Sequence, residues 1–427
     1  MDTLPLRYAG LWSLEADLVR YCVSFRGVAQ RPIAWGALTR LDWSKVLAVA
    51  TEQGVAPFLY APLAGLKDLA VPGDVLDRLR RTCQITAARN RLSAQAVTEL
   101  IAAFREARVP LLVLKGVALL NTVYKEAPHL RSFLDIDLLV REPDLARAHG
   151  VLTDLGYAPQ GDESAVSANM YHLPMYLKAG ERVELHFDLV KGHAPFRVAL
   201  PELWSRARSI PVNGGEMLVF SPEDALLHGA LHLSFHKEFV SRTLRQLRDL
   251  GEIASKEPVR WDQLRDLASR YRAERSLYYA LRLARDLLDA PIAEDVLAAL
   301  RRQIGRWELA LFSQVEDEGG FVTYRDPLRL FLQMLLLQVP AYRGWGRIRF
   351  LRNALLHPFR YNLSAAEQIP AEYRVSRFHP WHVLLGLRLL GKGLSIALDT
   401  LRRALAIFPS TGRKTSTAAI LGPGDGA

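Results

Sequence analysis

Cysteine is scarce in this sequence. The 427 residues include two cysteines, Cys22 and Cys83. Two thiols cannot build a disulfide framework or a zinc site with four thiolate ligands. This low count is typical of a protein from a reducing compartment, so we expect a cytoplasmic location. Both cysteines lie in helical patterns, and we interpret them as buried apolar residues.

Long hydrophobic runs are also lacking. The apolar stretch at 330–339 is shorter than the ~20 residues that a membrane-spanning helix needs. The N-terminus lacks the basic segment and unbroken apolar stretch of a secretory signal. The sequence contains no G-x-S-x-G, no Walker A loop and no G-x-G-x-x-G turn. We therefore expect a soluble or peripheral protein, without support for the serine hydrolase, P-loop or dinucleotide-binding classes.

Positive charge is concentrated at one end of the chain. The formal net charge is +10, and residues 328–427 contain 14 Lys or Arg against four Asp or Glu. This stretch is either a solvated basic surface or a surface for an anionic partner such as nucleic acid, a membrane or a phosphorylated substrate. Its segment 381–408 has helical periodicity with interspersed basic residues. That pattern suits peripheral contact with an anionic membrane, or a core helix with a basic rim.

The remaining composition predicts a globular α+β protein. Hydrophobic residues make up 50% of the chain and charged residues 23%, which permits a large buried core. Helical periodicity dominates the beginning of the chain, whereas short apolar runs in the middle predict a small mixed β-sheet. The expected regions are an N-terminal helical region 1–107, a sheet-containing core 108–220, a helical domain 221–327, a basic helical region 328–408 and a disordered tail 409–427.

Individual elements can be placed from the same periodicities. From 201 onward we expect mostly helix, with Ser221 as the cap of one helix. The KAGE sequence centred on Gly180 predicts a tight turn between two strands. Helices are predicted at 74–107, 142–157, 242–256, 260–272, 274–289 and 293–304. Strands are predicted at 111–116, 133–140, 172–177 and 182–190, with the helices of the core on one face of their sheet.

Asp135 and Asp137 lie one residue apart in the strand predicted at 133–140. Side chains alternate across a strand, so both carboxylates would project from one face. Adjacent carboxylates repel each other unless a cation lies between them, and hard divalent cations prefer oxygen ligands. D-x-D pairs are frequent on exposed strands, but this pair interrupts an apolar one. We therefore interpret it as a metal site for phosphoryl transfer.

A second polar strand face follows at 182–190. Glu184, His186 and Asp188 share that face. If this strand lies beside the one that carries Asp135 and Asp137, either Glu184 or Asp188 could supply a third carboxylate. His186 would orient a metal ligand, contact phosphate or make a structural hydrogen bond.

Basic and glycine residues upstream fit a phosphate. Lys115 and Gly116 lie where a strand meets a helix, and glycine allows a phosphate to approach the backbone. Lys115 would be a mobile positive charge there. Arg131 could make bidentate contact with a phosphate.

These motifs resemble the uncharacterised nucleotidyltransferase family of the polymerase-beta-like superfamily. The shared motifs are L-K-G at 114–116, R-x-x-x-D-I-D-L-L-V at 131–140, L-G-Y at 155–157 and E-L-H at 184–186. The likeness is weaker over 220–255, where His232 and Asp249 match a helical His and a later Asp. Where this chain has Lys-Gly, the superfamily usually has Gly-Ser or Gly-Gly. The lysine therefore either replaces a hydrogen bond by a charge contact or marks different substrate handling.

The resemblance implies an enzyme. It would transfer a nucleoside monophosphate from a nucleoside triphosphate such as ATP to an unidentified acceptor, with release of pyrophosphate. The implied catalytic residues, which also bind Mg²⁺ or Mn²⁺, are Asp135, Asp137 and Glu184. The expected nucleotide-binding residues are Lys115, Gly116, Arg131, His186 and His232. A sugar, a peptide, a protein hydroxyl and an RNA end remain open as acceptors.

Three other functions compete with this one. Glycosyltransferases also use D-x-D, although they usually place a larger parallel α/β domain before it. A sheet that has lost its chemistry would leave a nucleotide-binding module. The basic region at 328–408 could serve a membrane or nucleic-acid adaptor.

A zinc site has little support in the sequence. His228, His232 and His236 recur every four residues on a predicted helix, but Gly229 stands where an H-E-x-x-H motif has its glutamate. We expect His232 to pack against the sheet or to touch substrate.

Overall fold

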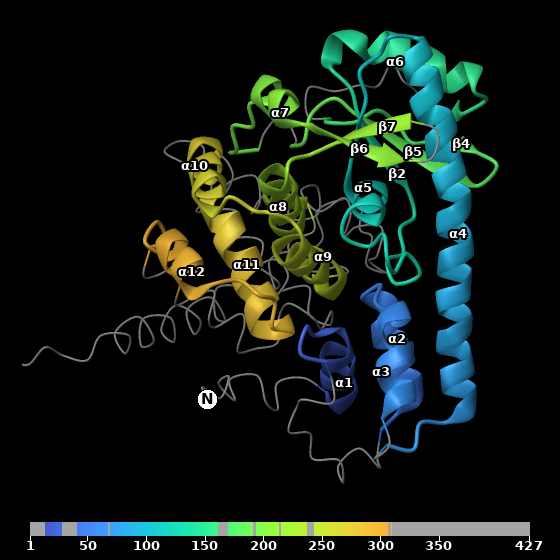
Figure 1. Ribbon diagram of the computed structural model, residues 1–427, viewed down its shortest axis with the longest axis vertical. Helices are drawn as coiled ribbons and strands as arrows, with labels where there is room; N and C mark the ends of the chain where they lie inside the picture. The colour runs from blue at the N-terminus through green and yellow to red at the C-terminus, as the bar shows by residue number, and fades with distance from the viewer. Residues whose placement is uncertain are drawn as a thin grey trace, which may run out of the picture.

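The structure of the protein is a computed structural model (Figure 1). It describes residues 13–27, 41–66, 69–160, 170–190, 194–212, 215–236, 243–305 and 309. These ranges contain twelve α-helices and one mixed sheet of seven strands, which confirms the predicted α+β class. The sheet lies at one end of a long helix, the N-terminal helices lie at the other end, and further helices pack alongside (Figure 1).

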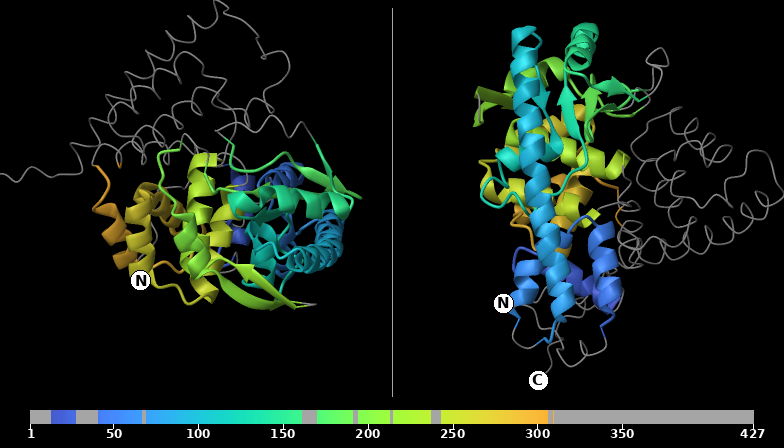
Figure 2. Two further views of the ribbon diagram at one scale, coloured as in Figure 1. Left: turned by 90° about the horizontal axis from the view of Figure 1, so that it is seen from above. Right: turned by 90° about the vertical axis from the view of Figure 1, so that its right-hand side faces the viewer.

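The long helix, α4 (Gly73–Glu106), agrees with the prediction for 74–107. Its 34 residues make it about 51 Å long at 1.5 Å per residue. It contacts the N-terminal helices at one end and α6, beside the sheet, at the other. Figures 1 and 2 show it as a continuous rod along the molecule. The short elements before it are α1 (Leu14–Val23), α2 (Trp43–Glu52), the 3₁₀ turn η4 (Ala56–Phe58) and α3 (Tyr60–Gly65).

The strand order in the sheet is β3-β4-β5-β2-β1-β7-β6. β2 pairs with β5 and β1 with β7 in parallel, and the remaining neighbours are antiparallel. The predicted turn at Gly180 joins β4 to β5, with φ of +87° at the glycine. The strands are β1 (Leu112–Val113), β2 (Ile136–Leu139), β3 (Ala158–Pro159), β4 (Tyr176–Lys178), β5 (Glu181–His186), β6 (Arg208–Val212) and β7 (Gly215–Val219).

Three details of the predicted core are wrong. The expectation that the chain is mostly helical from 201 misses the β6–β7 hairpin, which extends the sheet at its β1 side. The strands predicted at 133–140 and 172–177 begin later, at Ile136 and Tyr176. Those predicted at 111–116 and 182–190 end earlier, at Val113 and His186, so Asp188 lies beyond β5. The helices also do not share one face, because Leu203 of α7 (Leu200–Arg206) packs on the face opposite the main core. The other core helices are α5 (Lys115–Asn121), the 3₁₀ turn η5 (Glu142–Asp144) and α6 (Leu145–Asp154).

The two faces of the sheet differ in chemistry. Ile136 and Leu138 of β2 belong to the main hydrophobic core, whereas Leu139 belongs to the smaller cluster around α7. Because side chains alternate along a strand, Asp137 lies on the same face as Leu139. The sequence therefore buries the apolar side of β2 and leaves its acidic side for a site.

The helical predictions after 220 are confirmed within three residues at each end. Ser221 caps α8, and its hydroxyl accepts a hydrogen bond from the Asp224 backbone N–H at 3.1 Å. α8 and α9 contact each other and pack beside the sheet (Figure 1). The helices are α8 (Pro222–Leu231), the π-helical turn η7 (His232–His236), α9 (Thr243–Lys256), α10 (Trp261–Tyr271), α11 (Glu274–Leu288) and α12 (Glu294–Arg301).

The predictions for 328–408, its segment 381–408 and the tail 409–427 fall outside the described residues. The proposed region boundaries therefore stay predictions. In the part of the chain that is described, no helix combines the length and the apolar character needed to cross a bilayer.

Candidate nucleotidyltransferase site

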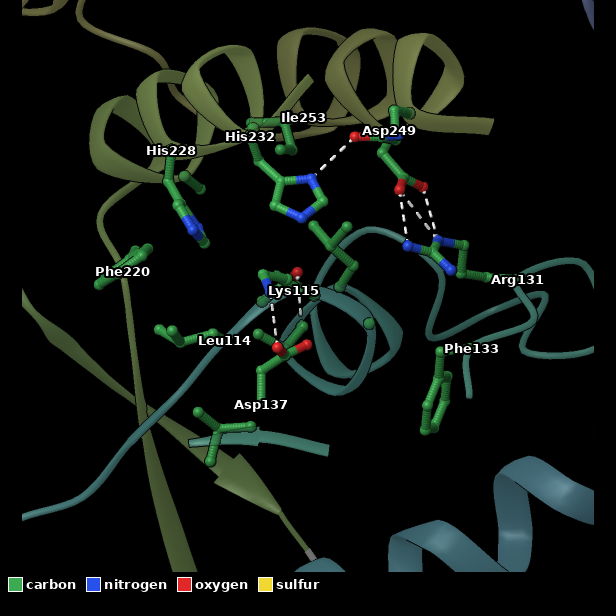
Figure 3. Close-up of a pocket in the computed structure, with 18 of the residues that line it drawn as sticks. Leu114, Lys115, Arg131, Phe133, Asp137, Phe220, His228, His232, Asp249 and Ile253 are labelled. Carbon is green, nitrogen blue, oxygen red and sulfur yellow. Dashed lines mark hydrogen bonds and ion pairs between the residues drawn. The ribbon is translucent and has the colours of Figure 1, made fainter. Parts of the chain in front are cut away.

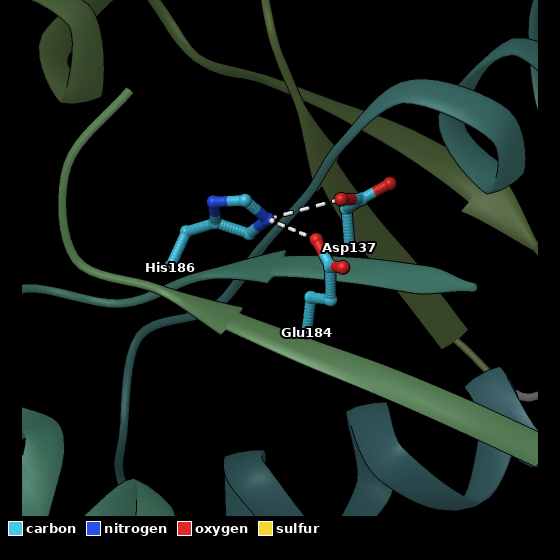
Figure 4. Close-up of side chains that lie close together, drawn as sticks. All are labelled: Asp137, Glu184 and His186. Carbon is cyan, nitrogen blue, oxygen red and sulfur yellow. Dashed lines mark hydrogen bonds and ion pairs between the residues drawn. The ribbon is translucent and has the colours of Figure 1, made fainter. Parts of the chain in front are cut away.

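Two carboxylates lie side by side on neighbouring strands. β2 and β5 pair in parallel, and Asp137 lies opposite Glu184. The two strands are therefore neighbours, which is the condition under which Glu184 could supply a third carboxylate. His186 follows on β5, and its Nε2 lies 3.0 Å from Asp137 Oδ1 and 3.4 Å from Glu184 Oε2 (Figure 4). Because ionised carboxylates only accept hydrogen bonds, Nε2 carries the hydrogen in this arrangement. Asp188, the other candidate, accepts hydrogen bonds from the backbone of Leu189.

Asp135 comes directly before β2 and lines the same cavity as Asp137 and Glu184. Burial raises the pKa of the Asp135 carboxyl, and the charges of Asp137 and Glu184 raise it further. Three acidic groups therefore repel one another within one small region. Such an arrangement favours a cation among them.

Lys115 supplies positive charge at this place. Its Nζ lies 2.6 Å from Asp137 Oδ1 (Figure 3). Burial alone would raise the pKa of Asp137, but the Lys115 ammonium and His186 outweigh burial and hold that pKa below its usual value. The φ of Lys115 is +47°, a conformation that is unusual for a residue with a side chain.

Gly116 is required by close packing. A Cβ at this position would lie 2.7 Å from Phe133 Cβ, which is closer than real contacts allow. Glycine thus lets the first turn of α5 lie against the segment that leads to Asp135. This role is separate from the phosphate contact expected from the sequence.

Arg131 is buried in an ion pair that links the segment before β2 to α9. Its Nε lies 2.8 Å from Asp249 Oδ1, and its Nη2 lies 2.8 Å from Asp249 Oδ2. Tyr124 donates its hydroxyl hydrogen to the same carboxylate at 2.9 Å. From α4, the Asn90 amide donates to the carbonyl oxygens of Pro128 at 2.6 Å and Arg131 at 3.0 Å. Helices from outside the core therefore hold the chain segment that enters β2.

Two histidines face the carboxylates from α8 and its C-terminal turn. His228 and His232 line the cavity opposite Lys115 and Asp137 (Figure 3). Burial lowers the pKa of His228 to about 3, and the nearby charge of Lys115 contributes. His232 Nδ1 lies 3.0 Å from Gln246 Oε1. The side chain of the third histidine in the repeat, at 236, is not among those described.

The cavity between the sheet and α8–α9 has a volume of about 640 Å³. It brings together seven of the eight residues predicted for the site, which are Lys115, Gly116, Arg131, Asp135, Asp137, Glu184 and His232. His186, the eighth, reaches the site through its contacts with Asp137 and Glu184.

Several lining residues were missed by the sequence analysis, among them Tyr171, Arg208, Arg245 and Glu257. Arg245 had a usable signal, because it precedes Asp249 by four residues and so lies on the same helix face. Tyr171 had none.

A divalent cation fits the donor set. Among the described residues, Asp137, Glu184 and His186 form the group in which one ligand atom of each lies within 4.8 Å of the others. Carboxylate oxygens suit Mg²⁺ and Mn²⁺, and imidazole suits transition metals. Asp135 lies outside this tight group but lines the same cavity. The candidate ligands are thus Asp137, Glu184 and His186, with the Asp135 carboxylate nearby in the same cavity.

Comparisons with known proteins point to one family. The solution structure of the antibiotic-resistance factor ANT(2'')-Ia is similar with a TM-score of 0.28 and 14% identity, over 50% of this chain and 94% of that chain. That likeness is too low to support an argument. No curated protein matches the chain. Residues 39–289, more than half of the chain, match the family described as "Uncharacterised nucleotidyltransferase". The chain therefore belongs to this uncharacterised nucleotidyltransferase family, as its L-K-G and D-I-D motifs indicate.

Proposed function

We propose that the protein is a polymerase-beta-like enzyme. It transfers a nucleoside monophosphate from a nucleoside triphosphate to an acceptor, with release of pyrophosphate. The observation that carries the proposal is the pairing of Asp137 with Glu184 on adjacent strands, beside Asp135 and Lys115 in one cavity. Membership in a nucleotidyltransferase family supports the same reaction class.

The carboxylates of Asp135, Asp137 and Glu184 would hold Mg²⁺ or Mn²⁺. When bound, such a cation neutralises charge on the phosphate oxygens and orients the triphosphate. Asp137 is ionised for this task, because Lys115 and His186 hold its pKa low despite burial. The pKa of Glu184 is also lowered, because the hydrogen bond from His186 and the charges of Lys115 and His186 together outweigh burial and the charge of Asp137.

Lys115 and His232 would bind the triphosphate, and Arg131 and His186 would position other groups of the site. Lys115 reaches the cavity from the first turn of α5, where Gly116 keeps the backbone close to Phe133. Arg131 would act by holding the segment before Asp135, since Asp249 already occupies its guanidinium. His232 would contact the nucleotide from the helical wall, and His186 would keep the two carboxylates in position.

The chemical step needs an acceptor hydroxyl beside the α-phosphate. The acceptor oxygen forms a bond to the α-phosphorus, and the bond from that phosphorus to the bridging oxygen breaks, so that pyrophosphate leaves. Glu184 accepts the hydroxyl proton in this scheme. Positioning and charge stabilisation would supply most of the rate. The acceptor is a sugar, a peptide, a protein hydroxyl or an RNA end.

The structure does not favour the glycosyltransferase alternative. The strands before Asp135 amount to β1 in the described residues, and helices precede it. A large parallel domain ahead of the motif, which that alternative needs, is not found there.

A label-transfer assay tests the proposal. The four α-labelled ribonucleoside triphosphates are incubated separately with the protein, Mg²⁺ or Mn²⁺, and a cell lysate as the acceptor pool. Glu184→Gln is compared with Glu181→Gln. Glu181 lies on the same strand, but its carboxylate accepts a hydrogen bond from Ser93 of α4 at 3.0 Å. The Asp135→Ala/Asp137→Ala protein serves as the negative control.

We expect label transfer and pyrophosphate release by the wild type and Glu181→Gln, and loss of both in the other variants. Equal transfer by Glu184→Gln and wild type would contradict the assigned roles. Failure of the wild type to bind or turn over any triphosphate with metal would contradict the function itself.

A further inference from the structure

The ammonium group of Lys115 lies where a cation would neutralise the carboxylates. Its Nζ is 2.6 Å from Asp137 Oδ1, and the same oxygen lies 3.0 Å from His186 Nε2. The Asp137 side chain is 3% exposed and that of Lys115 is 21% exposed. This is therefore a close ion pair with one partly open end. A metal ion bound to Asp137 would be repelled by the Lys115 ammonium, which already lies beside that carboxylate.

The backbone holds Lys115 in this place at a cost. A φ of +47° is unfavourable for a residue with a side chain, because its Cβ then lies too close to the following carbonyl oxygen. Glycine would remove that cost but would also remove the charge. The combination of an unfavourable backbone conformation with a charged side chain indicates a role for the ammonium rather than for the turn alone.

We propose that Lys115 is an exchangeable counter-ion, which neutralises Asp137 before substrate arrives and moves to the triphosphate when a divalent cation takes its place. This inference rests on the proposed nucleotidyl transfer. Two cations cannot share one carboxylate oxygen at contact distance without strong repulsion. The ammonium must therefore leave Oδ1 of Asp137 when that oxygen binds metal. The triphosphate offers it a new anionic partner within the same cavity.

The flexible stem of lysine permits this exchange. Four methylene groups link the ammonium to the backbone, so the ammonium can move while the backbone of α5 stays against Phe133. Arg131 could not move in the same way, because its guanidinium is buried and held by Asp249 at two points. Lys115 is thus a mobile positive charge in the described wall of the cavity, whereas Arg131 is a fixed one.

Exchange couples the two ligands. A metal ion that binds alone must displace the Lys115 ammonium from Asp137 and leaves it without an anionic partner. When the triphosphate binds together with the metal, the ammonium pairs with the phosphates instead. Each ligand therefore strengthens binding of the other by the same factor, typically about 5- to 150-fold for coupled sites. Removal of the lysine charge should change metal binding and triphosphate binding in opposite directions. A lysine that merely supported the fold would not produce that pattern.

The test is Mn²⁺ binding without turnover, followed by the electron paramagnetic resonance signal of free Mn²⁺. Lys115→Met is compared with wild type and with Lys178→Met. Lys178 lies on β4 of the same sheet, and its Nζ is 3.1 Å from Glu99 Oε1, away from the carboxylate cluster. Binding of the α,β-methylene analogues of the four ribonucleoside triphosphates is then measured by equilibrium dialysis in excess Mn²⁺.

We expect Lys115→Met to bind Mn²⁺ alone at least about fivefold more tightly and the analogues at least about fivefold more weakly. Lys178→Met should match wild type in both measurements. Unchanged or weaker Mn²⁺ binding by a folded Lys115→Met protein would overturn the inference.

A second measurement uses the wild type, in case Lys115→Met does not fold. Acetylation by an amine-reactive ester is followed by peptide mass spectrometry. Lys115 should react faster with Mn²⁺ than without it, and slower again once an analogue is added. A reactivity that Mn²⁺ does not increase would refute the exchange. This outcome differs from failure of the proposed function, in which no triphosphate or analogue binds the wild type in the presence of metal.

Discussion

The buried pair of Arg131 and Asp249 should be among the costliest places to alter in this protein. Both residues are nearly inaccessible, at 5% and 7% exposure. Asp249→Ala would leave the guanidinium buried without a counter-charge, a change that typically destabilises by about 3–5 kcal/mol. Tyr124 also loses its acceptor, and an unsatisfied buried hydroxyl adds a cost of about 1–3 kcal/mol when it cannot reach water. Added together, the two costs give an expected loss of about 4–8 kcal/mol in the free energy of unfolding.

Urea unfolding, followed by circular dichroism, measures this loss. Asp262→Ala provides the matched control, because Asp262 pairs with Arg265 at 2.7 Å but is 89% exposed. Exposed pairs of this kind contribute about 0–1 kcal/mol. The Arg131→Met/Asp249→Leu protein completes the design, since apolar residues of similar volume can replace a buried pair at small cost.

Two results would refute this reasoning. One is a loss below about 1 kcal/mol for Asp249→Ala, comparable to the exposed control. The other is an Arg131→Met/Asp249→Leu protein that loses as much stability as Arg131→Met and Asp249→Leu lose separately when added together, because an unpaired buried charge would then not be the cause.

Three further outcomes follow from the site. Glu184→Gln should lower kcat for label transfer by at least about 100-fold, the scale for removing a general base, and a smaller effect would exclude Glu184 as the proton acceptor. Gly116→Ala should destabilise by about 1–3 kcal/mol through its clash with Phe133, whereas Gly150→Ala, in open space on α6, should be neutral or stabilising in the same thermal melts. His228 has a folded-state pKa of about 3, so the unfolded chain binds its proton first as the pH falls. The stability that this residue contributes above about pH 6.5 should decline by about 1.4 kcal/mol per pH unit below it, and His228→Gln should flatten that part of the pH profile of unfolding.

Local patterns were sufficient for the helices. The prediction for 74–107 and those after 220 rest on apolar residues three and four apart, together with punctuation such as Ser221-Pro222. Such signals lie within one element and do not depend on its neighbours. The tight turn at Gly180 is local in the same sense, and it too is confirmed.

The hairpin of β6 and β7 was missed despite a signal. Asn213-Gly214 separates two short runs, and this dipeptide is the strongest short-range indication of a hairpin. Pro211 in the first run is unfavourable for a strand, because proline cannot donate a hydrogen bond to a sheet. The conflict is resolved by position, since β6 is the edge strand and Pro211 is tolerated there. The position of a strand in a sheet depends on the tertiary fold, so the sequence of β6 alone could not show that it lies at the edge.

The candidate site shows the same division. Alternation along each strand identified Asp137 and Glu184, but their adjacency depends on the pairing of β2 with β5. The contact between Lys115 and Asp137 depends on β1 lying beside β2. The partner of Arg131 is 118 residues away in sequence, on a helix whose position no strand pattern predicts. Residue types could be chosen from sequence, whereas their partners required the fold.

The interleaved order of the sheet has a consequence for synthesis of the chain. β1 lies between β2 and β7, although β7 is made about a hundred residues later. The wall of the cavity formed by α8 and α9 follows later still. A nascent chain that has just completed β5 possesses all three carboxylates, but it lacks β7, which pairs with β1, and the helices that cover the site. We therefore expect the ribosome-bound protein to stay inactive until α9 has emerged.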